Sequence, residues 1–329
     1  MSQPAISVAM SVYNNADYLA LAIESILAQS FEDFEFLILN DGSTDGSAAI
    51  IDHYAGKDSR VRAIHRENKG LIVSLNQLIA EARAPIIARM DGDDIAEPER
   101  FGRQFSFLQE NEDYGVTSSW THDIDGDGNP FRVSGREPPV THEDFLAAID
   151  DGPLLCHPSV MYRRDLVQGV GGYHAAFKHC EDYDLWLRLA AVTKLGSISE
   201  RLMHYRHTEG QVSNRHLVVQ QYGVAVSWFA RKEREAGRPD PTETLADLPP
   251  LDGLDALFGR PGTDRAVIAR LAPRILYSKV ALTSSGFDMI MNHLRTGHHI
   301  DGIWRTVPRL VRMGEPARAI KLALALAGV

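Results

Sequence analysis

Cysteine is scarce in this chain, with two among 329 residues. Cys156 and Cys180 lack both the spacing of metal ligands and the numbers of a disulfide framework, which predicts a reducing, cytoplasmic setting. Long apolar runs are also missing, because no window approaches the roughly 18 residues that a membrane-spanning helix needs. The opening residues, MSQPAISVAMSVYNN, lack the basic start and long apolar core of a signal peptide. We expect a strand there instead.

Positive charge is in deficit: 34 Lys and Arg face 44 Asp and Glu, a net charge of −10. This balance argues against a protein built to hold nucleic acid. The deficit is uneven along the chain. From Arg260 to the end, 11 Lys and Arg face 4 Asp and Glu, a balance of +7 that leaves −17 for the preceding residues. An acidic body and a basic tail are expected to be different functional regions.

The first third of the chain alternates short apolar runs with segments of helical periodicity. Strands are predicted at 6–12, 34–40, 61–65 and 85–90, with an amphipathic helix after each of the first three. Asn15 or Asp17 is a candidate N-cap of the first helix. Strands alternating with helices of this length predict an α/β protein with a mostly parallel sheet covered on both faces.

After Asn111 the alternation gives way to a different pattern. We expect a hairpin at 120–133, a helix at 142–149, a strand near 157–162 and a helix near 182–192. The stretch 238–253 is rich in Pro and Asp and is the best candidate for a linker. Beyond it, amphipathic segments predict an all-helical C-terminal region.

Three polar clusters follow predicted strands: Tyr13 and Asn14, then Asp41, then Asp91 to Asp94. Polar loops are common, so one cluster alone would mean little. Ligands of open parallel sheets bind at the carboxyl ends of the strands, and three clusters on that edge favour a ligand site.

The sequence DGDD places Asp91, Asp93 and Asp94 almost side by side. Such a cluster suits a hard divalent cation, Mn²⁺ or Mg²⁺, whose coordination is completed by substrate phosphates and water. Asp94 has a second interpretation, as N-cap or first-turn acid of the helix that begins near Pro98.

Four motifs, in order, resemble family 2 glycosyltransferases of the GT-A fold: SVYNNADYLALAIESILAQSFEDFEFLILNDGSTDGS, NKG, ARMDGDD and CEDYDLWLRL. The resemblance covers about residues 5–214. It implies a Rossmann-like half that binds a nucleotide-sugar, usually a UDP-sugar, and a second half that binds the acceptor. We therefore expect a transferase domain at 1–214, divided into 1–111 and 112–214, followed by a helical region at 215–329.

The resemblance assigns roles to residues at the matching positions. Tyr13 would lie against the nucleotide base, beside Asn14, and Asp41 would accept a hydrogen bond from the base. Lys69 would help to hold the nucleotide. Asp91 would reach the ribose or a metal-bound water, and Asp93 would bind the metal. His207 stands where relatives often have a histidine near the metal or the pyrophosphate; a purely structural role is an equal alternative.

The run HCEDYDLWLRL supplies the other half of the chemistry. Transfer with inversion needs a base that takes the proton of the acceptor hydroxyl. The resemblance places this base in the Glu181–Asp182 pair, and we choose Asp182 with Glu181 in reserve. Asp184 lies four residues before Arg188 and is expected to pair with it on the helix. Trp186 is expected in the core.

The sequence thus predicts an inverting glycosyltransferase that moves a sugar from a nucleotide-diphosphate donor to a saccharide or lipid-linked saccharide acceptor. Bacterial surface polysaccharide or glycoconjugate synthesis is the expected setting. A non-catalytic nucleotide-sugar-binding scaffold and a sugar-1-phosphate nucleotidyltransferase are the alternatives. The basic C-terminal region is expected to be a packed helix with a solvated face; peripheral contact with an anionic membrane is the second interpretation.

Overall fold

An eight-stranded sheet organises the first part of the chain in the computed structural model, which describes residues 3–131, 137–208, 216–295 and 297–328. The spatial order is β3–β2–β1–β4–β7–β6–β8–β5. The first four strands in this order are parallel, whereas β7 is antiparallel to both of its neighbours. The strands are β1 (Ile6–Val12), β2 (Phe34–Asp41), β3 (Val61–Arg66), β4 (Ile86–Asp91), β5 (Ile95–Ala96), β6 (Tyr114–Ile124), β7 (Met161–Arg163) and β8 (Lys194–Arg206).

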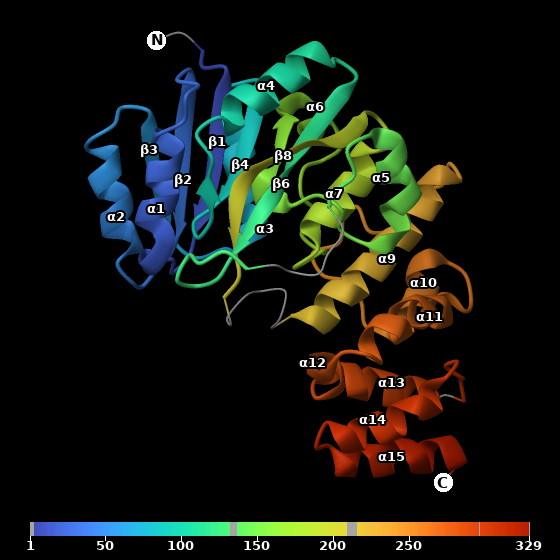
Figure 1. Ribbon diagram of the computed structural model, residues 1–329. Helices are drawn as coiled ribbons and strands as arrows, with labels where there is room; N and C mark the ends of the chain where they lie inside the picture. The colour runs from blue at the N-terminus through green and yellow to red at the C-terminus, as the bar shows by residue number, and fades with distance from the viewer. Residues whose placement is uncertain (1–2, 132–136, 209–215, 296, 329) are drawn as a thin grey trace. The chain divides into compact units, whose positions relative to one another are not determined.

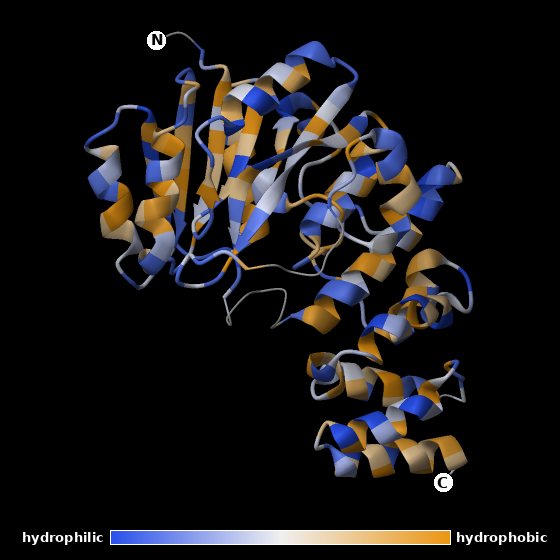
Figure 2. Ribbon diagram, viewed as in Figure 1, coloured by the Kyte–Doolittle hydropathy of each residue, from blue (hydrophilic) through white to orange (hydrophobic). Residues whose placement is uncertain are grey.

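The parallel half of the sheet is built from apolar runs buried on both faces. Figure 2 colours β1 and β2 largely as hydrophobic, and every residue of β2 is buried. Continuous burial of this kind is typical of parallel strands covered by helices on both sides. The predicted α/β class with a mostly parallel sheet is confirmed, and Figure 1 shows β3, β2, β1 and β4 side by side in that order.

The register brings the ends of three parallel strands to one edge. Val12 of β1 lies opposite Asn40 of β2, and Ser11 lies opposite Asp91 of β4. Tyr13, Asp41 and the residues after Asp91 therefore leave the sheet at the same level. The three polar clusters share one edge of the sheet, as the sequence predicts; ligand binding at this edge stays a prediction.

Helices cover this sheet along the alternating chain. Leu19, Ile23 and Ile26 of the first helix are buried, as its periodicity predicts, and Ala22 is buried beside them. The helices of this part are α1 (Ala16–Leu27), α2 (Ser47–Ala55), α3 (Leu71–Glu81), α4 (Arg100–Glu110), α5 (His142–Ala148), α6 (Arg164–Gly169) and α7 (Glu181–Leu189).

Three local predictions need correction. Asn15 occupies the N-cap position of α1, but its side chain makes no capping bond; Asp45 accepts from the Ala16 N–H instead. The strand predicted near 157–162 is a 3-10 turn at His157–Ser159 followed by β7, because Pro158 cannot donate to a ladder. Asp94 does not cap α4, which begins at Arg100.

The predicted hairpin at 120–133 is present in part. β6 ends at Ile124, which forms an antiparallel bridge to Pro130, and Asp125 accepts from the backbone N–H groups of Asp127 and Asn129. Residues 132 and 133 lie outside the described part of the chain.

The chain divides into two compact units, 1–175 with 181–208 and 176–180 with 209–329. The second unit is helical and has its own apolar core, contributed by helices from Val218 to Leu322. No helix in the described residues is long and apolar enough to cross a membrane. The domain boundaries and the linker expected from the sequence stay predictions. The helices of this unit are α9 (Leu217–Glu235), α10 (Leu254–Phe258), α11 (Thr263–Ile275), α12 (Lys279–Leu282), α13 (Ser285–Arg295), α14 (Thr306–Arg312) and α15 (Pro316–Ala327), with 3-10 turns at Leu251–Gly253 and Ile303–Arg305.

Candidate active site

The acidic cluster, Asp91, Asp93 and Asp94, forms where β4 leaves the sheet. Carboxylate oxygens from all three residues lie within 4.8 Å of one another. Asp94 is buried, whereas the Asp91 side chain is 31% exposed. Gly92 permits the tight path between them, because a Cβ there would stand 3.2 Å from the Asn15 amide nitrogen. The cluster is therefore held against the start of α1.

Two arginines supply positive charge to the acidic cluster. The guanidinium of Arg89 is buried and its Nη1 lies 2.5 Å from Asp91 Oδ2. Arg206, at the end of β8, donates its backbone N–H to Asp94 Oδ1 at 2.8 Å and its Nε–H to the Asp93 carbonyl at 2.7 Å. Sequence reasoning missed Arg89, and it offered Arg206 only as one of several possible donors, without these contacts. The one available signal was an arginine inside the otherwise apolar run PIIARM, where an unpaired charge would be costly.

The carboxyl groups of the acidic cluster are crowded together despite these partners, which shows in their pKa values. Burial, and then the charge of Asp91, raise the pKa of Asp93 to about 6. Burial together with Asp93 and Asp91 raises the pKa of Asp94 well above its ordinary value. Asp94 Oδ2 is buried and has no hydrogen-bond partner among the described residues. An orphaned carboxylate oxygen beside two further carboxylates fits a divalent cation that prefers oxygen ligands.

Asp41 fastens the loop that follows β3. Its Oδ1 accepts from Arg66 and from the Lys69 N–H at 2.9 Å, and its Oδ2 accepts from the Gly70 N–H at 2.8 Å. Oδ1 thus accepts two hydrogen bonds, from Arg66 Nε and from the Lys69 N–H, whereas Oδ2 accepts one, from the Gly70 N–H. Because each carboxylate oxygen has about two acceptor positions, one position on Oδ2 stays open among the described residues. The Lys69 side chain is exposed beside it.

Tyr13 and Asn14 form the loop between β1 and α1. The Tyr13 side chain is 52% exposed, which suits a platform for a planar group. Asn14 adopts a left-handed backbone conformation with φ +53°, and its Oδ1 accepts from the Thr44 N–H at 2.8 Å. The loop after β1 is thus tied to the loop after β2.

The acid pair, Glu181 and Asp182, opens α7. Burial, and then Asp182, raise the pKa of Glu181 to about 8; burial raises the pKa of Asp182 to about 6. The Tyr183 N–H donates to Asp182 at 2.7 Å and opposes this rise. The positive charge of Arg89 lowers both values and the negative charge of Asp91 raises both. The acid pair and the acidic cluster therefore belong to one electrostatic site.

The structure gives His207 a different neighbour from the expected one. Its Nε2 lies 2.7 Å from Asp123 Oδ1, and its ring stands edge to face with Phe131 and Tyr205. His207 is not among the side chains whose ligand atoms gather in the acidic cluster. Its role as a metal ligand stays a prediction.

The remaining residues of α7 have the structural roles expected of them. Arg188 donates through Nε and Nη2 to Asp184 at 2.9 and 2.7 Å, and Asp184 is fully buried. Trp186 is fully buried as well. Burial raises the pKa of the Cys156 thiol, so this cysteine is not poised as a nucleophile.

Comparison with known proteins decides the family. Residues 7–171, half of the chain, match the model described as glycosyl transferase family 2. A putative glycosyltransferase EpsE of Bacillus subtilis is 36% identical over 193 residues, which are 57% of this chain and 67% of that protein. The chain belongs to glycosyl transferase family 2. The O-antigen biosynthesis glycosyltransferase WbnJ of Escherichia coli is 32% identical to this transferase over 205 residues, covering 61% of this chain and 79% of WbnJ.

Solved structures confirm the GT-A fold of the transferase. Staphylococcus aureus TarS 1–349, in complex with UDP-GlcNAc, superposes with a TM-score of 0.58 at 16% identity, over 98% of this chain and 92% of TarS. The mannosyltransferase PcManGT of Pyrobaculum calidifontis, in complex with GDP-Man and Mn²⁺, superposes with a TM-score of 0.54 at 15% identity, over 98% of this chain and 87% of PcManGT. The predicted fold, family and enzyme class are all confirmed.

Proposed function

We propose that this transferase moves a sugar from a nucleoside-diphosphate donor, a UDP-sugar, to a hydroxyl of a saccharide or lipid-linked saccharide, with inversion. The observation that carries the proposal is the acidic cluster at the end of β4, in which three carboxylates gather within 4.8 Å, Asp94 Oδ2 lacks a partner among the described residues, and buried Arg89 pairs with Asp91. TarS with UDP-GlcNAc and PcManGT with GDP-Man and Mn²⁺ support a nucleotide-sugar donor and a divalent ion. WbnJ supports a setting in surface polysaccharide synthesis.

The donor binds along the carboxyl edge of the parallel strands. Tyr13 stacks on the base, beside Asn14, and the open acceptor position of Asp41 takes a hydrogen bond from it. Lys69 helps to hold the nucleotide, and Asp91 contacts the ribose or a metal-bound water. Asp93, with its neighbours in the acidic cluster, holds Mn²⁺ or Mg²⁺, and that ion, when bound, neutralises charge on the leaving diphosphate.

Asp182 is the base of the transfer. With a pKa of about 6 it is mostly ionised at neutral pH, whereas Glu181, at about 8, keeps its proton and can only donate it in a hydrogen bond. Asp182 accepts the proton of the acceptor hydroxyl while that oxygen bonds to the anomeric carbon. The bond from this carbon to the diphosphate oxygen breaks with its electron pair on the leaving group. One such displacement inverts the anomeric centre.

The sequence left two alternatives, a sugar-1-phosphate nucleotidyltransferase and a non-catalytic scaffold. Family membership removes the sugar-1-phosphate nucleotidyltransferase. A scaffold without activity would have no need of an acid pair with raised pKa values, since burying the Glu181 carboxyl beside Asp182 costs stability.

A thermal-shift screen of nucleotide-sugars tests the proposed function. A UDP-sugar at about 100 times its Kd, with Mn²⁺, is expected to stabilise the native chain by about 2.7 kcal/mol, since the ligand binds only the folded state. For a domain of this size the shift in Tm is roughly 5–10 °C. The shift should shrink when EDTA replaces Mn²⁺, and the free sugar should give none. Failure of every nucleotide-sugar to raise Tm would contradict donor binding.

A further inference from the structure

A groove of about 650 Å³ lies within the second unit, and none of the residues of the candidate active site lines it. It runs between α11 and the segment from Gly297 to Arg309, and all of its lining comes from this unit. Its floor is apolar, with Ile268, Ala272 and Leu276 buried, and its rim is basic. The volume falls in the range of ~300–1,000 Å³ that is usual for small-molecule sites. We call it the arginine groove.

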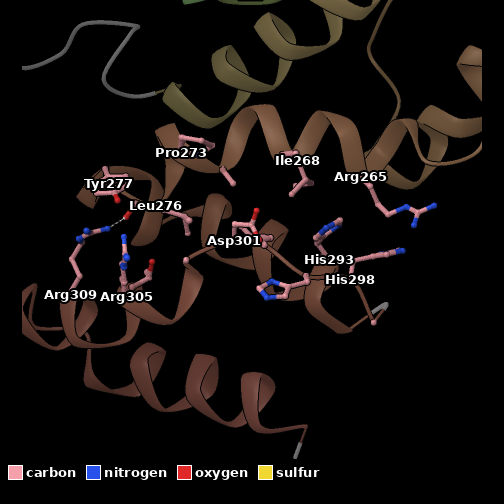
Figure 3. Close-up of a pocket in the computed structure, with 17 residues that line it drawn as sticks. Arg265, Ile268, Pro273, Leu276, Tyr277, His293, His298, Asp301, Arg305 and Arg309 are labelled. Carbon is pink, nitrogen blue, oxygen red and sulfur yellow. Dashed lines mark hydrogen bonds between the residues drawn. The ribbon is translucent and has the colours of Figure 1, made fainter.

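Arg305 and Arg309 form the cationic end of the arginine groove. They are four residues apart on one continuous helical stretch, so their side chains share a face, as Figure 3 shows. Neither guanidinium forms an ion pair with a carboxylate in the described part of the chain. Like charges at this spacing destabilise a helix slightly. An anion between the two would remove that cost.

The guanidinium of Arg309 is held in place before any ligand binds. It donates from Nη1 to the Leu276 carbonyl at 2.6 Å and lies 4.0 Å above the centre of the Tyr277 ring. A guanidinium has five N–H donors, so most of them stay available. A fixed fork of this kind matches the oxygens of a phosphate group.

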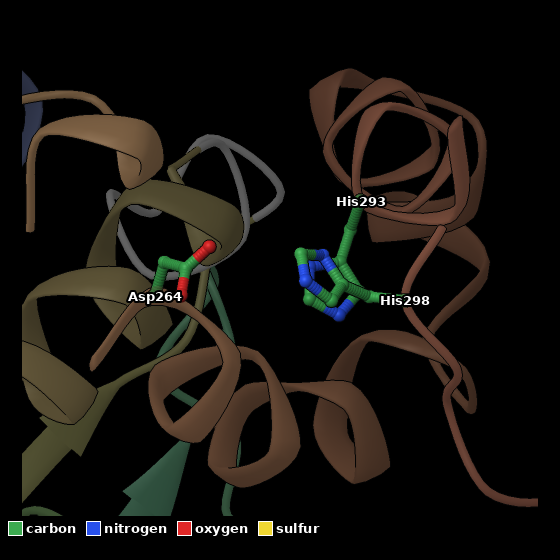
Figure 4. Close-up of side chains that lie close together, drawn as sticks. All are labelled: Asp264, His293 and His298. Atoms are coloured by element: carbon green, nitrogen blue, oxygen red, sulfur yellow. The ribbon is translucent and has the colours of Figure 1, made fainter. Parts of the chain in front are cut away.

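The rest of the groove suits neutral polar groups. Asp301 stands between the two ends in Figure 3, and its carboxylate can accept from hydroxyls but repels a second anion. At the far end His293 is 4% exposed and stacks on His298 with centroids 5.0 Å apart. Figure 4 shows both rings facing Asp264 of α11. Burial, and then His298, lower the pKa of His293, so its imidazole is neutral at neutral pH.

We propose that the arginine groove binds a phosphate group carried on a saccharide, with Arg305 and Arg309 on the phosphate and Asp301 and His293 toward the sugar hydroxyls. This choice of ligand rests on the proposed function, because a lipid-linked saccharide acceptor carries phosphate where the sugar joins the lipid. The same chemistry is offered by a free sugar phosphate and by a lipid headgroup. The groove is thus a second ligand site, separate in residues from the donor site.

Calorimetric titration of the full chain with glucose 1-phosphate tests this site, with glucose as the uncharged comparison. Glucose 1-phosphate is expected to bind saturably and more tightly than glucose. The double variant R305Q/R309Q should weaken this binding roughly tenfold or more, because charge-assisted hydrogen bonds are lost. R312Q is the matched control, since Arg312 is exposed on the same helix and does not line the groove. R305Q alone serves if the double variant melts early, because the Arg305 guanidinium lies 5.4 Å from the centre of the exposed Trp304 ring and contributes little to the core.

Further arms identify the source of the phosphate and the nature of the contact. The phosphate belongs to a lipid headgroup if the chain sediments with phosphatidylglycerol vesicles but not with phosphatidylcholine vesicles, and if this sedimentation depends on Arg305 and Arg309. The phosphate belongs to a free ligand if the chain binds the sugar phosphate but neither kind of vesicle. The proposal is overturned if glucose 1-phosphate does not bind saturably, if R312Q loses as much affinity as R305Q/R309Q, or if EDTA abolishes the binding. UDP binding measured on the same samples separates the two sites. Its absence beside intact groove binding would count against the proposed function only.

Discussion

Replacing Asp182 with Asn is expected to reduce kcat by about 10²–10⁴-fold, the range that a general base contributes. The amide preserves the shape of the side chain and its contact with the Tyr183 N–H, but it cannot take a proton. The Kd of the nucleotide donor should stay within about twofold, because Asp182 acts on the acceptor and not on the nucleotide. The measurement is UDP release from the donor found in the screen, together with calorimetry for the donor Kd.

Glu181→Gln is the matched control for Asp182. A glutamine imitates the protonated form that Glu181 already has at neutral pH, so E181Q should keep most of its activity. The wild-type kcat/KM should fall as pH drops below about 6, where Asp182 takes up a proton, and should be level from there to about 8, where Glu181 loses its proton. Full activity in D182N, or inactivity in E181Q with activity in D182N, would move the base to another residue.

Replacing Asp93 with Asn is expected to weaken UDP binding in the presence of Mn²⁺ by at least roughly 100-fold, since even partners of metal ligands contribute 10–100-fold to affinity. In EDTA the variant and the wild type should bind UDP alike. The proton on Asp93 competes with the ion, so the effect of Mn²⁺ on wild-type affinity should decline as pH falls below about 6. Calorimetric titration of UDP with Mn²⁺ or EDTA measures both.

D127N is the control for D93N. Asp127 is exposed in the turn after β6 and belongs to no group of gathered ligand atoms in the described chain. D127N removes one negative charge from the first unit, as D93N does. UDP affinity in D127N should therefore match that of the wild type. An equal loss in both variants would mean that net charge, and not a metal site, governs the affinity.

The sequence predicts the parallel half of the sheet well because each strand carries its own signal. Apolar runs such as FEFLILN end in turn residues, and the alternation with helices fixes which ends meet. The roles of Asp184 and Trp186 could be predicted equally well. Asp184 lies four residues before its partner Arg188, and Trp186 has apolar neighbours in the sequence. In these cases the pattern of neighbouring residues in the sequence is enough to predict the structure.

The electrostatics of the site could not be predicted in the same way. Arg206 meets Asp94 across 112 residues of sequence, through the pairing of β8 with its neighbours. A helix start was one of the two interpretations of Asp94, but the residue is buried and its carboxylate accepts from the Arg206 backbone N–H. Arg89 is a lone charge in an apolar strand, and only the fold reveals that it acts on both Asp91 and the acid pair. Long-range contacts of this kind leave no periodic trace in the sequence.

The central claim is a single displacement with Asp182 as the base, and the anomeric form of the product tests it most directly. Proton NMR can follow the sugar that the full chain releases from an α-linked UDP-sugar with Mn²⁺, water serving as the acceptor, before mutarotation mixes the anomers. The account predicts that the β anomer appears first and that D182N releases almost none. Initial release of the α anomer would contradict direct displacement.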